Sequence, residues 1–69
     1  MQNFELESHE YIELNNLLKV TGLCESGGRA KLLVAEGLVK VDGQIELRKR
    51  CKIRRGQSVE FQGETIAVI

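Results

Sequence analysis

The sequence predicts an α+β fold in which a two-helix hairpin packs on a small, mainly antiparallel sheet of about four to five short strands. Two observations support this fold class. Between residues 11 and 36 the apolar residues recur at three- and four-residue steps, which is the spacing of one helix face. After Gly37 the apolar period falls to two, which is typical of strands. The 69 residues are enough for one domain, so we expect a single domain over residues 1–69 with a small core.

A strand and then a helix are predicted first. Apolar and acidic side chains alternate over residues 4–7, which predicts a short strand that could pair with a C-terminal strand at 65–69. The apolar stripe of the first helix consists of Tyr11, Leu14, Leu17 and Leu18. Gly22 is expected to end this helix because glycine readily adopts positive φ.

A second helix is predicted from Gly27 to Glu36. Ser26 stands at the N-cap position, where its side chain can accept a backbone N–H, and Gly37 follows the helix. The short connection between the helices predicts that they pack as a hairpin.

The remaining chain reads as strands joined by tight turns. Asp42-Gly43 tolerates positive φ and joins a strand at 39–41 to a returning strand that would carry Ile45 and Leu47. Further turns are predicted at 54–57 and 62–64, on either side of a strand with Val59 and Phe61.

The charges are strongly polarised along the chain, although the formal net charge is zero. Residues 1–25 carry five acids and one base, whereas residues 26–55 carry nine bases and three acids. The stretch RKRCKIRR, residues 48–55, alone holds six of the ten bases. Such a one-sided charge distribution favours a polyanionic partner.

Little in the sequence suggests catalysis or a metal site. His9 is the one histidine and lies in a polar segment, so we expect an exposed residue, and neither a catalytic triad nor a Walker-type loop can be assigned. Cys24 and Cys51 with one histidine are too few ligands for structural zinc. We therefore expect no cofactor and no enzyme. We expect Cys51 to be a small apolar residue packed in a strand, and this is favoured over a redox thiol activated by the surrounding cations.

The chain is expected to be a cytoplasmic protein without a membrane partner. No apolar run approaches a membrane span, and the acidic start MQNFELESHE lacks the layout of a secretory signal. Two cysteines also agree with a reducing compartment.

Two elements could hold phosphates. The basic stretch 48–55, in an extended or loop conformation, could follow a phosphate backbone, although a charged run can equally be a solvated face. The second helix opens with Gly27 and Gly28, where free N–H groups bind anions and glycine lets a phosphate approach closely. The alternative is that these glycines only ease a tight bend between the helices.

Residues 12–61 resemble the S-four RNA-binding domain, also called the alpha-L motif. The matching positions are Leu14, Leu17, Leu18, Gly22, Ser26, Ala30, Gly37, the hairpin Val39-Lys40-Val41-Asp42-Gly43, Gly56 and Val59. The short chain with its extra N-terminal strand is similar to the small stand-alone bacterial members.

The resemblance implies a non-catalytic, monomeric protein that holds structured RNA, such as ribosomal or transfer RNA, on a basic face formed by the two helices and the adjoining loop. The RNA-binding candidates are Ser26, Gly27, Gly28, Arg29, Lys31, Lys40, Arg48, Lys49, Arg50, Lys52, Arg54 and Arg55. Many members carry Arg directly after the helix-starting Ser, where this chain has Gly27, so Arg29 and Lys31 are expected to take over.

The acidic N-terminal segment is expected to lie away from the RNA. The three aromatic residues, Phe4, Tyr11 and Phe61, sit in apolar patterns that suit a core, so base stacking is not expected to contribute much to binding.

Two other functions remain open on sequence alone. Two helices followed by a hairpin also describe a winged helix-turn-helix that binds DNA. A protein adaptor could instead use the basic strip to dock an acidic partner.

Overall fold

The structure is a computed structural model, and it describes residues 2–69. Its elements in chain order are β1 (Gln2–Phe4), β2 (Ile12–Glu13), α1 (Leu14–Val20), α2 (Gly27–Ala35), β3 (Val39–Val41), β4 (Gln44–Ile45), β5 (Lys52–Ile53), β6 (Ser58–Phe61) and β7 (Glu64–Val68). Among these described residues no helix is long and apolar enough to cross a membrane.

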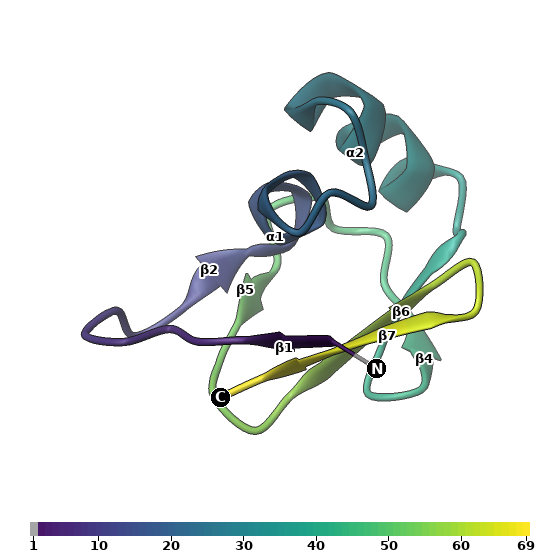
Figure 1. Cartoon of the computed structure of the whole chain (residues 1–69). Helices are drawn as coiled ribbons and strands as arrows, with labels where there is room; N and C mark the ends of the chain where they lie inside the picture. Colours follow the sequence, from purple (N-terminus) through teal and green to yellow (C-terminus); the bar gives the residue numbers. More distant parts are fainter. Residues whose placement is uncertain (1) are drawn as a thin grey trace.

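The strands form two sheets. The larger sheet has the order β1-β7-β6-β3-β4 and is antiparallel except for the parallel pair β1–β7, whereas β2 and β5 form a separate antiparallel pair. Figure 1 shows both helices on one side of the larger sheet. The predicted α+β class, with a helix pair on a mainly antiparallel sheet and an N-terminal strand beside the C-terminal one, is confirmed.

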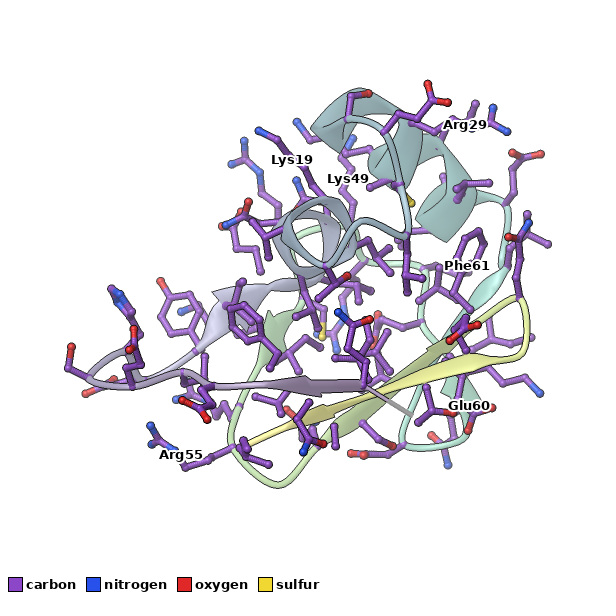
Figure 2. All side chains as sticks on the ribbon, viewed as in Figure 1. Lys19, Arg29, Lys49, Arg55, Glu60 and Phe61 are labelled. Carbon is purple, nitrogen blue, oxygen red and sulfur yellow. The ribbon has the colours of Figure 1, made fainter. Side chains whose placement is uncertain are left out.

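The core lies between the helices and the larger sheet. Side chains along β6 alternate, so that Val59 and Phe61 are buried while Glu60 is exposed. Figure 2 shows this alternation, with Phe61 directed toward the helices and Glu60 away from them. The fully or nearly fully buried partners from the helices include Leu14, Leu17, Leu18, Ala30 and Val34.

The glycine-containing turns follow their local sequences. Asp42 and Gly43 take φ values of 52° and 83° between β3 and β4, the double positive φ of a tight hairpin turn. Gln62 and Gly63 repeat this with φ values of 52° and 78° between β6 and β7. The turn predicted at 54–57 is also present, with Gly56 at a φ of 91°, so the three predicted turns are confirmed.

The first helix begins later than predicted. It starts at Leu14, and the two residues before it form β2, so the placement of Tyr11 on the helix is wrong. Ile12 lies opposite Ile53, which is fully buried, and this long-range packing prevails over the local helical spacing.

Two strand predictions also need correction. The first strand covers Gln2–Phe4 rather than residues 4–7, because the chain turns away at Glu7, whose φ is 58°. Leu6 nevertheless reaches the core, with its N–H donating to the carbonyl of Ile69. Strand β4 ends at Ile45, and Leu47 lies beyond it with 60% of its surface exposed.

Candidate nucleic-acid interface

The loop that carries the first part of the basic stretch is anchored on the start of α1. Asn15 N–H donates to the carbonyl of Lys49 at 3.0 Å, and Leu14 N–H donates to the carbonyl of Cys51 at 2.9 Å. These carbonyls satisfy two of the unpaired N–H groups of a helix start, where the side chain of Glu13 supplies no cap. Lys49 is therefore held beside the polar side of α1.

Lys19 belongs to the same region, although it was not among the predicted contact residues. It lies one helical turn after Asn15, so the two residues share one side of α1. Figure 2 shows Lys19 and Lys49 above α1, away from the larger sheet. The sequence signal that could have found Lys19 is the polar stripe Asn15, Asn16 and Lys19 opposite the leucines.

The start of α2 is open to solvent. Ser26 caps the helix as predicted, with its Oγ accepting Arg29 N–H at 3.2 Å. Within residues 2–69 no acceptor is found for the N–H groups of Gly27 and Gly28. A Cβ at Gly27 would meet nothing within 4 Å, and at Gly28 only Ser26 Oγ at 3.9 Å, and neither glycine has positive φ. Neither crowding nor backbone strain thus requires these glycines, which favours the anion-binding interpretation.

One open hollow brings α1 and the start of α2 together. Its lining includes Asn15, Asn16, Lys19, Gly27, Gly28 and Lys31. We define the helix-side surface as Lys19, Gly27, Gly28, Lys31 and Lys49. It combines three ammonium groups with the positive end of a nine-residue helix.

The acidic N-terminal segment borders this hollow, contrary to the prediction that it lies elsewhere. Glu5, Glu7 and Glu10 line the same hollow as Lys19 and Lys31. Glu13 at the start of α1 lines it too, and because carboxylates repel phosphate, the part of the hollow that suits an anion is the one formed by Lys19, Lys31 and the start of α2.

Arg48 is engaged by a neighbour within the chain. Its Nε and Nη2 donate to Glu46 Oε2 and Oε1 at 2.9 and 3.1 Å, and its backbone N–H also donates to Glu46. These hydrogen bonds from Arg48 lower the pKa of Glu46 to about 2. A guanidinium held in this way is less available to phosphate than the ammonium of Lys49.

Glu46 gives the fold an acid-dependent contribution to stability. Because its folded pKa is about 2, below the ordinary value of 4.5, the contribution is fully present above about pH 4.5 and is lost as pH falls toward 2. We expect Glu46→Gln to lower the melting temperature clearly at pH 7 and much less at pH 2, which is near the folded pKa of Glu46. Thermal unfolding by circular dichroism at both pH values measures this, and an equal deficit at both would contradict it.

The second part of the basic stretch lies elsewhere. In β5 the side chain of Ile53 is buried, so Lys52 and Arg54 project to the opposite face, next to Tyr11. Arg55 Nη2 donates to the carbonyl of Glu7 at 2.6 Å, and Figure 2 shows it far from Lys49. The stretch 48–55 therefore does not supply one face beside the helices, because the chain enters β5 midway and runs along the second sheet.

Two further candidates are separated from the helix-side surface. Lys40 lies between the buried Val39 and Val41, so it occupies the sheet face opposite the helices, where the strand register places it opposite Glu60. Arg29 is exposed on α2, but Figure 2 shows it away from Lys19 and Lys49. The structure thus brings Gly27, Gly28 and Lys31 to one hollow. It holds Lys49 beside Asn15, which lines the same hollow, and the exposed Arg50 follows Lys49 in the chain.

Both cysteines are free thiols, one buried and one half-buried. Cys24 is buried, and this burial raises its thiol pKa. Burial and the nearby Glu46 also raise the pKa of Cys51 against the opposing effect of Arg48, which disfavours the alternative of a thiol activated by cations. Residues 2–69 contain no group of three or more potential metal ligands, and His9 is exposed.

The aromatic residues differ in their environments. Phe61 is buried and Phe4 packs against the core, as predicted. Tyr11 is 38% exposed, so its assignment to the core is wrong.

Comparison with known proteins agrees with this architecture. Residues 4–69 match a family model described as the S4 domain, the S-four domain identified above. The YbcJ proteins of Escherichia coli strain K12 and Shigella flexneri are each 52% identical over 69 residues, covering all of this chain and 99% of theirs. The solution structure of E. coli YbcJ, described as revealing an alfaL motif involved in RNA binding, superposes with a TM-score of 0.77 over all of this chain and 87% of that one.

Proposed function

The chain belongs to the S4 domain family, and from this premise we propose that it is a non-catalytic RNA-binding protein that holds a structured RNA on the helix-side surface. Two observations carry the proposal: Lys19 and Lys31 line one hollow with the open start of α2, and Lys49 is held beside the start of α1. They stand out in a chain whose net charge is zero. The proposed ligand class is ribosomal or transfer RNA.

The proposed binding is electrostatic. Ammonium groups on flexible side chains neutralise phosphates as point charges, while the N–H groups of Gly27 and Gly28 can approach one phosphate closely. Such contacts fix the position of an RNA backbone without reading its sequence. The engaged guanidinium of Arg48 and the distant Lys40 are left out of this surface.

The RNA-binding description of the E. coli YbcJ structure supports the proposal, because that chain is 52% identical and covered over most of its length. We further propose that residues 1–69 form one domain, which acts as a monomer in the cytoplasm and needs no cofactor.

Binding should weaken steeply with salt. If about four phosphates are neutralised, the slope of log K against log salt concentration should be near −3, because each contact releases somewhat less than one counterion. Fluorescence anisotropy of a labelled transfer RNA at several salt concentrations measures the slope. A nearly flat response would reject the phosphate mechanism.

A duplex DNA of equal length is the control for nucleic-acid class. We expect it to compete poorly with the RNA, because a surface that follows RNA shape does not match the geometry of B-form DNA. Tighter binding of the DNA would instead favour the winged-helix alternative.

A further inference from the structure

Tyr11 is an exposed aromatic side chain flanked by two cations. Lys52 Nζ lies over its ring at 4.9 Å from the centroid, and Arg54 Cζ lies at 5.7 Å. The ring is 38% exposed, and no hydrogen bond of its hydroxyl is found within the described residues. Tyr11 therefore has neither the burial nor the polar anchor of a structural core tyrosine.

The pairing of β2 with β5 explains why these three side chains meet. The register sets Ile12 opposite Ile53 and Glu13 opposite Lys52, so one further step sets Tyr11 opposite Arg54. Because side chains alternate along strands, the isoleucines face the core and the other residues face outward. We call Tyr11, Lys52 and Arg54 the tyrosine platform.

The platform adjoins the loop that carries Lys49. A small hollow lined by Arg48, Arg50, Cys51 and Lys52 connects that loop to β5. Tyr11 also lies two residues before Glu13, the N-cap of α1, so it is about 7 Å along the strand from that cap. One RNA strand can therefore run from the helix-side surface onto the platform.

We propose that Tyr11 stacks on an unpaired base of the bound RNA, while Lys52 and Arg54 shift from its ring to the flanking phosphates. This inference rests on the proposed function and adds a site for single-stranded RNA beside the phosphate-binding surface. Aromatic rings accept any base because every base has a π-face, and cations beside the ring suit the backbone that connects stacked bases. Glu13 lies opposite Lys52 on the outward face of β2, and Tyr11 also borders the hollow that Glu5, Glu7 and Glu10 line. Lys52 and Arg54 are therefore the groups that would attract phosphate to this site.

The chain contains its own reporter for this site, since Tyr11 is the only tyrosine and there is no tryptophan. The probes are a short RNA hairpin with an unpaired loop and a blunt RNA duplex of the same length. Stacking should quench the tyrosine emission with the hairpin and leave it nearly unchanged with the duplex.

Substitutions separate stacking from packing and from phosphate binding. We expect Tyr11→Phe to bind the hairpin within about twofold of the parent chain, and Tyr11→Leu to bind about tenfold more weakly, because leucine keeps apolar contacts but cannot stack. Circular dichroism checks that both variants fold. A hairpin with abasic loop positions has no base to stack, so the parent chain should bind it as weakly as Tyr11→Leu binds the intact hairpin. Tyr11→Leu should bind the abasic hairpin with the same affinity as the parent chain does.

The outcomes distinguish the two proposals. If Tyr11→Leu binds the intact hairpin with full affinity, the stacking site is wrong while RNA binding stands. If the emission responds equally to the duplex, Tyr11 does not select an unpaired base, and the inference is also wrong. If neither RNA binds the parent chain, the proposed function and the stacking site both fail.

Discussion

Replacing Lys19, Lys31 and Lys49 together by glutamate should weaken RNA binding by about a hundredfold or more. Each exposed charge pair is worth about 1 kcal/mol at contact distance in water, and reversal of the sign turns that attraction into a similar repulsion. Three reversals on one surface should therefore remove much of the electrostatic attraction on which phosphate binding depends. Folding should be preserved, because surface substitutions change stability by no more than about 0.5 kcal/mol. Anisotropy with labelled transfer RNA measures the affinity, and circular dichroism checks the fold.

The matched control is a single charge reversal on the opposite side of the molecule. Lys49→Glu and Lys40→Glu change the net charge equally, but only Lys49 lies beside α1, whereas Lys40 lies on the sheet face away from the helices. We expect Lys49→Glu to cause a clear loss of affinity and Lys40→Glu almost none. Equal losses would mean that net charge, and not this surface, determines binding.

Ile53→Ala should cause the largest loss of stability among simple truncations of β5. Ile53 is fully buried and joins the second sheet to the core below α1. Truncation of a buried isoleucine costs about 2–5 kcal/mol, and a domain of this size has roughly 3–10 kcal/mol in total. Urea unfolding should show this as a large shift of the midpoint.

Ile45→Ala is the control for Ile53→Ala, because it removes the same atoms from a side chain that is 60% exposed. Its midpoint should stay close to that of the parent chain, since little apolar surface is lost from the core. If both substitutions lower the urea midpoint equally, Ile53 is not part of the core, which would contradict the structure.

Local sequence signals were sufficient for most of the fold. The cap at Ser26 and the glycine after Glu36 identified α2 to within one residue, because both act through hydrogen bonds or φ values close in the chain. The hairpin turn at Asp42-Gly43 was identified for the same reason. The leucine stripe located α1, although not its first residue.

The second sheet could not be predicted in this way. It pairs residues about forty positions apart through two residues on each side, so neither strand has a periodic signal of its own. Because this sheet forms, the first helix begins after Tyr11, and the basic stretch 48–55 is divided between two regions. The position of Lys40, by contrast, follows from its place between two apolar strand residues, and the alternation could have excluded it from the helix side.

Mapping of backbone amide chemical shifts during titration with transfer RNA tests the location of the RNA most directly. The perturbations should concentrate at Asn15, Lys19, Gly27, Gly28, Lys31 and Lys49, with little change at Lys40 and Glu60 on the opposite sheet face. Perturbations centred on that sheet face, or confined to residues 52–55 with Gly27 and Gly28 unchanged, would contradict binding through the helix-side surface.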